Sequence, residues 1–104
     1  MTTALLGGQE VHIDDEGFMT DPAEWSDDLA EVLAKQIDIA LTDDHWTVLR
    51  FLREDFDSVG ETASLRRIST QIGVSTKELF GLFPKKPGKK MAYVAGLPKP
   101  KGCI

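Results

Sequence analysis

The sequence predicts a mainly α fold, a small helical bundle with an N-terminal β-hairpin and a flexible C-terminal arm. Three observations predict it. Capping residues precede several runs of apolar residues at helical spacing, a Gly-Gly pair separates two short apolar runs near the start, and the end is rich in Lys, Pro and Gly. At 104 residues the chain has room for one core. We therefore expect a helical domain with its hairpin over residues 1–95 and a mobile arm over residues 96–104.

The first predicted element is a β-hairpin between Leu5 and Ile13. Gly7-Gly8 supplies the two residues of a tight turn, because glycine readily adopts positive φ angles. After the turn, Val11 and Ile13 alternate with polar residues, which is the pattern of a strand with one buried face. The acidic stretch 14–17 that follows lacks the alternating ligands and distal Glu of a calcium loop, and we expect a solvated turn there.

The rest of the domain is predicted to be helical. The first helix is expected after the N-cap Ser26, and the second from Thr42 to about Gly60. The third is expected over residues 65–72, where Gly73 ends it, and the fourth opens with a capping box at Ser75 and closes at Pro84. A short fifth helix is expected over residues 89–95. The spacing of Trp25, Trp46, Phe51 and Phe56 matches the apolar faces of these helices. We therefore assign these four aromatic residues to the core rather than to a cofactor site.

The net charge of −5 hides a strong asymmetry along the chain. Residues 1–65 hold sixteen Asp or Glu and three Lys or Arg, whereas residues 66–104 hold one acid and nine bases. A basic end on an acidic body suggests that the end meets an acidic partner, a nucleic acid or the body itself. The alternative interpretation is ordinary solvated surface charge.

The sequence contains no motif for metal binding, phosphate binding or serine-based catalysis. His12 and His45 lie on different elements, and neither has a second His or Cys at a metal-ligand spacing. The chain shows no phosphate-cradling Gly-rich loop and no Ser nucleophile elbow. No targeting segment and no apolar run of transmembrane length is visible. We expect no metal, no cofactor, no membrane partner and a cytoplasmic location.

One segment resembles a DNA-binding unit. Residues 68–83 have the form helix, Gly-containing turn, helix, and residues 72–75 resemble the turn of a bacterial repressor. The second helix offers Lys77 beside Glu78 and few groups suited to base edges, and the body is acidic. Two packed helices are the favoured explanation of the pattern, and DNA is not the expected ligand.

Cys103 is the residue with the clearest chemical potential. It is the single cysteine, so no internal disulfide can form, and such usage fits a reducing cytosol. Two prolines and two glycines keep the segment around it extended, and the seven residue steps from Gly96 can span roughly 25 Å. The thiol could thus enter another protein's pocket, where a minor thiolate fraction would react. The alternative is an incidental tail cysteine.

The C-terminal residues 95–104, with the pattern Ala-Gly-Leu-Pro-Lys-Pro-x-Gly-Cys-Ile, resemble the end of the DsrC/TusE sulfur-relay family. The resemblance continues through most of the chain. The matching blocks, in the family's order, are residues 15–18, Trp25, residues 41–46, residues 51–53, residues 82–84 and residues 87–89. The sequence is therefore identified as similar to this family over nearly its whole length.

The resemblance implies a function for Cys103. Family members are small helical proteins whose penultimate cysteine carries sulfur as a persulfide or forms mixed disulfides with partners. Ala92 stands where the two-cysteine members have a second thiol, so this chain resembles the single-cysteine TusE type. The resemblance implies a sulfurtransferase-like carrier rather than a stand-alone enzyme.

The partners that this resemblance implies are sulfur-donor and sulfur-acceptor proteins that dock the C-terminal arm. The relay would serve thiolation of the tRNA wobble uridine, through a tRNA-thiolating enzyme, or general sulfur trafficking. Two alternatives stay open: a DsrC-like partner of dissimilatory sulfite reductase, and a regulatory or DNA-binding helix-turn-helix module.

Overall fold

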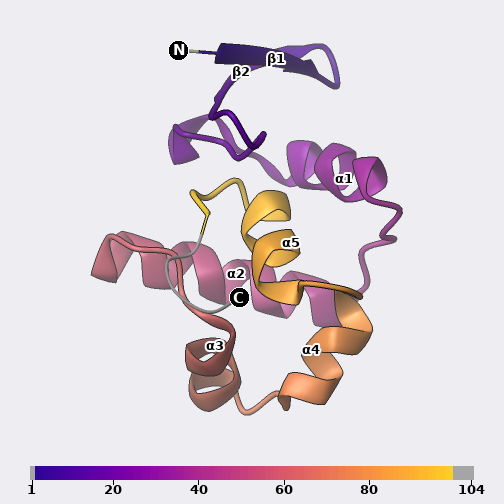
Figure 1. Cartoon of the computed structure of the whole chain (residues 1–104), viewed down its shortest axis with the longest axis vertical. Helices are drawn as coiled ribbons and strands as arrows, with labels where there is room; N and C mark the ends of the chain where they lie inside the picture. The colour runs from indigo at the N-terminus through magenta and orange to yellow at the C-terminus, as the bar shows by residue number, and fades with distance from the viewer. Residues whose placement is uncertain (1, 100–104) are drawn as a thin grey trace.

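The computed structural model describes residues 2–99, which form a β-hairpin followed by five α-helices (Figure 1). The elements are β1 (Thr2–Leu6), β2 (Gln9–Ile13), the short 3-10 helix η1 (Pro22–Glu24), α1 (Asp27–Gln36), α2 (Asp43–Val59), α3 (Leu65–Ile72), α4 (Thr76–Leu82) and α5 (Pro87–Val94). The predicted fold class is confirmed. None of the described helices is long and apolar enough to cross a membrane.

The hairpin forms around the predicted Gly7-Gly8 turn and ends at Ile13 as predicted, but its first strand begins at Thr2 and not at Leu5. β1 and β2 pair in antiparallel fashion with Leu6 opposite Gln9, and Gly7 and Gly8 have φ of 57° and 83°. Two positive φ angles in a two-residue loop match the right-handed twist of the paired strands. Val11 is fully buried, so one face of the hairpin lies on the helices.

The helix ends also follow the predicted capping residues. The Ser26 hydroxyl accepts a hydrogen bond from a backbone N–H in the first turn of α1, and Ser75 does the same for α4. Gly60 and Gly73 end α2 and α3 in the left-handed conformation, with φ of 85° and 72°. These ends are local features, which is why the sequence reveals them.

The last helix differs from its prediction. α5 spans Pro87–Val94, whereas residues 89–95 were expected from the sequence. Proline has no N–H to lose and a fixed φ that suits the first helical position, so Pro87 begins this helix rather than preceding it. Lys86 is its N-cap, and both Lys85 and Lys86 have positive φ, at 60° and 53°.

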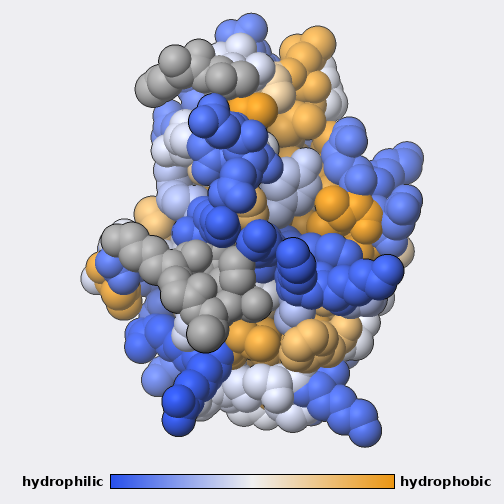
Figure 2. All heavy atoms as spheres, viewed as in Figure 1, coloured by the Kyte–Doolittle hydropathy of each residue, from blue (hydrophilic) through white to orange (hydrophobic). Residues whose placement is uncertain are grey.

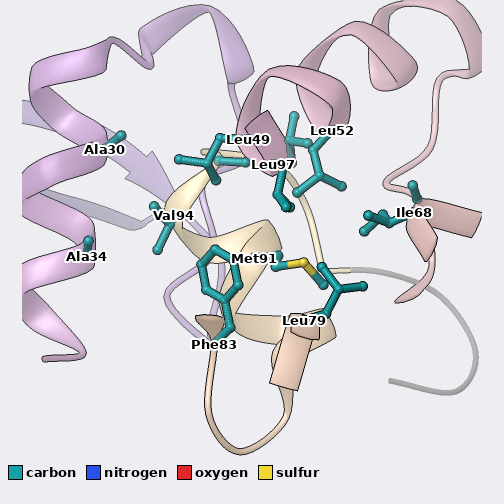
Figure 3. Close-up of a cluster of buried hydrophobic side chains, with 13 residues drawn as sticks. Ala30, Ala34, Leu49, Leu52, Ile68, Leu79, Phe83, Met91, Val94 and Leu97 are labelled. Carbon is teal, nitrogen blue, oxygen red and sulfur yellow. The ribbon is translucent and has the colours of Figure 1, made fainter. Parts of the chain in front are cut away.

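α5 lies at the centre of the helices and contacts α1, α2 and α4 (Figure 1). Buried side chains from all five α-helices converge around it (Figure 3), and the main cluster comprises Ala30, Ala34, Val48, Leu49, Leu52, Ala63, Ile68, Leu79, Phe83, Met91, Val94, Ala95 and Leu97. A second cluster of Val11, Met19, Leu29 and Leu33 lies under the hairpin. The four aromatic residues assigned to the core pack against the main cluster, but each is only partly buried.

Candidate functional site: the root of the C-terminal arm

The predicted thiol site falls on a part of the chain that the structure does not describe. Cys103, with the rest of residues 100–104, lies outside the described residues. The segment that leads to it, residues 95–99, is described, and we call this segment the arm root. Its contacts define where the arm leaves the helical domain.

The arm root begins as the C-cap of α5. Gly96 has φ of 69°, and its N–H donates to the carbonyl oxygen of Tyr93 at 3.2 Å, while the N–H of Leu97 donates to the carbonyl oxygen of Ala92 at 3.0 Å. These two bonds form a Schellman motif, in which a left-handed glycine ends a helix. The Leu97 side chain is fully buried in the main core. The chain is therefore still fixed one residue after the position where the arm was expected to begin.

Trp25 closes over this C-cap. Its indole N–H donates to the carbonyl oxygen of Val94 at 2.8 Å. A Cβ built on Gly96 would lie 2.3 Å from Cδ1 of Trp25, far closer than two carbon atoms approach. Glycine is thus required at position 96 both by its φ and by the indole beside it. Trp25 was assigned to the core alone, and the structure adds this contact with the arm root.

Arg53 of α2 ties the arm root to η1. Its Nη1 donates to the carbonyl oxygen of Ala95 and its Nη2 to that of Pro22, both at 2.8 Å. The guanidinium carbon lies 4.3 Å from the centroid of the Trp25 ring, a cation–π distance. Burial lowers the pKa of Arg53 from its ordinary value, and the charge of Asp57 opposes this. The guanidinium nevertheless stays protonated, because arginine is not deprotonated in proteins.

Two further contacts hold the end of the arm root. The Thr62 hydroxyl donates to the carbonyl oxygen of Pro98 at 2.7 Å, and Nζ of Lys99 lies 3.1 Å from a carboxylate oxygen of Glu16. The ion pair is largely exposed, so it contributes little, about 0 to 1 kcal/mol. A shallow pocket of about 180 Å³ adjoins these contacts and is lined by Phe56, Gly60, Glu61, Thr62, Pro98 and Lys99.

Sequence blocks that are far apart in the chain thus meet at one place. Glu16, Trp25 and Arg53 come from three separate blocks that the sequence analysis matched to one family, and all three contact the arm root. The sequence reasoning named none of them as a site residue. Their occurrence in the matched blocks was the available signal, because blocks that are far apart in the sequence can be brought to one site by the fold.

Ala92 lies in α5 and is fully buried, so this position belongs to the helix and not to the arm. Its carbonyl accepts the Leu97 N–H. A side chain at position 92 therefore meets the interior of the domain, while position 103 follows the last described residue by four.

The two histidines have structural roles. Nδ1 of His12 lies 2.9 Å from Glu24, and the buried His45 lies between Thr42, at 2.8 Å from Nδ1, and the carbonyl oxygen of Leu82, at 2.7 Å from Nε2. Among the described residues, no three His, Cys, Asp or Glu side chains are close enough to hold a metal ion.

The helix-turn-helix outline is present in α3 and α4, joined through Gly73. Ser75 and Glu78, at the start of α4, bond each other in a capping box: Ser75 accepts from the Glu78 N–H at 3.1 Å, and its hydroxyl lies 3.2 Å from the Glu78 carboxylate. Lys77 is exposed between them. Two of the first polar residues of the second helix are thus occupied in forming that helix.

The model of one protein family, described as DsrC like protein, matches residues 5–104. The chain belongs to this DsrC family. Among curated relatives, the protein named Sulfurtransferase TusE of Photorhabdus laumondii is 35% identical over 111 residues and is covered completely, as is this chain. That of Escherichia coli K12 is 35% identical, with 96% of this chain and 98% of the relative covered.

Solved structures agree with this assignment to the DsrC family. The structure of DsrC from Allochromatium vinosum superposes with a TM-score of 0.85 at 33% identity and covers 98% of this chain and 97% of that one. The oxidized gamma subunit of dissimilatory sulfite reductase from Archaeoglobus fulgidus gives a TM-score of 0.81 at 32% identity, with 99% and 100% covered. The resemblance stated from the sequence motifs is thereby confirmed.

Proposed function

We propose that this protein is a sulfur carrier in a sulfur relay and that Cys103 holds the sulfur as a persulfide. The observation that carries the proposal is the convergence of the family-matched blocks on the arm root, which ends four residues before a penultimate, single cysteine. The relatives named Sulfurtransferase TusE, which match over nearly their whole length, support it.

The proposed step is an exchange at sulfur that needs no external oxidant or reductant. The Cys103 thiolate attacks the outer sulfur of a persulfide on the donor protein. The donor's S–S bond breaks as the new S–S bond forms, so Cys103 becomes a persulfide and the donor cysteine leaves as a thiolate. The same exchange then passes the outer sulfur to the thiolate of an acceptor.

The arm root would give this thiol a fixed origin. Because Leu97 is buried and Pro98 is bonded to Thr62, the reach of Cys103 is counted from Lys99 and not from Gly96. Four residue steps span at most about 14 Å. The site on a donor or acceptor would thus lie within that distance of Lys99, which is a tighter limit than the roughly 25 Å expected from the sequence.

The partners would be donor and acceptor proteins that dock the arm in the cytoplasm, where thiols stay reduced. The final acceptor would be a tRNA-thiolating enzyme or another protein of sulfur trafficking. The second candidate is a DsrC-like partner of dissimilatory sulfite reductase, favoured by the solved structures that bear that name. With Ala92 in place of a second thiol, Cys103 would work there only through bonds to other molecules.

Intact-mass analysis after incubation with a cysteine desulfurase and its relay proteins tests the proposal. We expect one added sulfur atom that a reductant removes. Cys103→Ser should prevent the addition and leave the thermal unfolding midpoint unchanged, since a residue after the arm root adds little packing. Equal loading of the serine variant would refute the role of Cys103.

A further inference from the structure

A second feature of α5 lies at its other end, where residues 84–90 form what we call the lysine loop. Four of its seven residues are lysines and none is acidic. Nζ of Lys90 donates to the carbonyl oxygen of Pro84 at 2.5 Å. Lys85 and Lys86 are exposed and Lys89 is partly exposed, and none of these three is in an ion pair within residues 2–99. Their charges are therefore not neutralised by the domain.

The backbone of the lysine loop is unfavourable for lysine. Lys85 and Lys86 are consecutive residues with φ of 60° and 53°, a region that glycine and asparagine occupy more easily. Lys86 also precedes Pro87, and a residue before proline prefers extended backbone angles. The turn itself gives no reason for two lysines here. Backbone outliers of this kind point to a role for the side chains that they carry.

The start of α5 adds to the same positive field. The N-cap Lys86 makes no side-chain capping bond, and the first turn of α5 contains no acidic residue. Every other described α-helix except α3 has an acid in its first turn, where the helix dipole favours one. A negative group from outside the chain would meet three unpaired lysines and a helix N-terminus together.

We propose that the lysine loop is a docking surface for an acidic segment of a sulfur-donor or sulfur-acceptor protein; this proposal rests on the proposed function. The eight residues of α5 are about 12 Å long; the first four belong to the lysine loop, and the last four lead to the arm root. A partner seated on the loop therefore lies beside the volume that Cys103 can reach from Lys99. The expected partner has Asp and Glu side chains around its reactive cysteine.

The surface fits an acidic protein better than a nucleic acid. The lysine loop contains only Lys, Pro and Gly. It has no arginine, which binds a phosphate through two hydrogen bonds, and no aromatic side chain, which stacks on bases. Figure 2 shows hydrophilic side chains in a band across the middle of the face, at the height of α5 in Figure 1. Elsewhere α1 and α2 open with paired acids, which repel an extended phosphate backbone.

Titration of the full-length, isotope-labelled protein with three probes tests the proposal by NMR. A short poly-L-glutamate peptide should shift the backbone amide signals of residues 85, 86 and 88–90, and added salt should reverse the shifts. Poly-L-glutamine of the same length should give no shift. Absence of shifts with polyglutamate, shifts confined to other residues, or tighter binding of a short duplex RNA would each overturn the proposal.

Paired variants separate charge from fold. Lys85→Asn with Lys86→Asn keeps residues that tolerate positive φ, and it should weaken polyglutamate binding by about three- to tenfold. Lys35→Gln with Lys77→Gln removes the same charge from other exposed sites and should leave binding unchanged. Equal weakening by both pairs would mean a general charge effect and overturn the proposal. The Cys103→Ser variant should bind polyglutamate with the affinity of the wild type. A failure of sulfur loading would therefore count against the proposed function and not against this docking surface.

Discussion

The two ends of the described chain attach to the helical domain by different means. The N-terminal hairpin lies on its own small cluster, and its side-chain hydrogen bonds centre on Glu24. The Glu24 carboxylate accepts the His12 N–H at 2.8 Å and lies 2.9 Å from Nδ1 of the same residue, and the Glu24 carbonyl oxygen accepts from Nε2 of Gln9 at 2.8 Å. The arm root enters the main core through Leu97. Trp25, Arg53 and Thr62 hold it by donating to backbone carbonyls.

This difference indicates which end the fold holds more firmly. An indole, a guanidinium and a hydroxyl keep their protonation states over the whole range in which proteins work, whereas a carboxylate does not. Under the proposed function the thiol meets cysteines on two partners, and a firmly held arm root would fix the point from which it reaches them. The proposed function places no reactive residue on the hairpin. The following predictions test whether the arm root is the more firmly fixed of the two.

The largest expected effect is that of Leu97→Ala. It removes a fully buried side chain from the main core and should lower the free energy of unfolding by about 2 to 5 kcal/mol. Leu5→Ala in the hairpin, at a side chain that is 72% exposed, should change it by less than about 0.5 kcal/mol. Urea unfolding followed by tryptophan fluorescence measures both. Similar small losses for the two variants would contradict a buried arm root.

Gly96→Ala should be the next most damaging change. Positive φ alone costs an alanine about 1 to 2 kcal/mol, and here the new methyl group also forces Trp25 to move. Gly73→Ala is the matched control, because Gly73 is a helix C-cap with φ of 72° and open space around it. Thermal unfolding should show a larger fall in midpoint for position 96. Equal falls would mean that the indole contact adds nothing.

Arg53→Met should cost about 1 to 3 kcal/mol, because two backbone carbonyls lose a charged donor while the apolar stem is retained. Arg50→Met removes an exposed arginine that pairs with Asp27 and should cost at most about 1 kcal/mol. The signal of the Trp25 indole N–H reports the local effect. It should shift in the first variant and stay in place in the second.

The smallest expected effect is a pH dependence of the hairpin that residues 95–97 of the arm root do not share. Hydrogen bonds from His12, first from its backbone N–H and then from its side chain, hold the pKa of Glu24 below its ordinary value of 4.5. The stabilisation is therefore complete above that pH and is lost as the pH falls through the lower, folded-state pKa. Amide signals of β2 should move in this acid range and those of residues 95–97 should not. Glu24→Gln should abolish the movement, and concerted movement of both regions would refute the distinction.

The sequence was a good guide wherever one or two residues decide the backbone. Gly7-Gly8, Ser26, Gly73 and Ser75 act on their own turn or helix end, and the structure has each element where they predict it. The start of α5 was missed because Pro87-Gly88 serves equally well as a turn or as a first helical turn. The positive φ angles of Lys85 and Lys86 could not be foreseen, since lysine has no preference for them.

The arm root was also beyond local reasoning. Pro98 and Gly96 together favour an extended segment, and nothing next to them in the chain reports that Trp25, Arg53 and Thr62 converge on it. These contacts join residues 36 to 69 positions apart. The matched family blocks contain Glu16, Trp25 and Arg53, but the sequence does not show that these residues meet at the arm root.

The central claim is that Cys103 both accepts sulfur and passes it on. The most direct measurement loads the purified protein with radioactive sulfur through a cysteine desulfurase and its relay proteins, removes them, and adds an excess of a candidate acceptor protein. We expect the label to leave this protein and appear on the acceptor as a reductant-sensitive persulfide, and Cys103→Ser to carry none. Label that stays on the wild-type protein with every acceptor tried, or that reaches an acceptor equally well through the serine variant, would contradict the account.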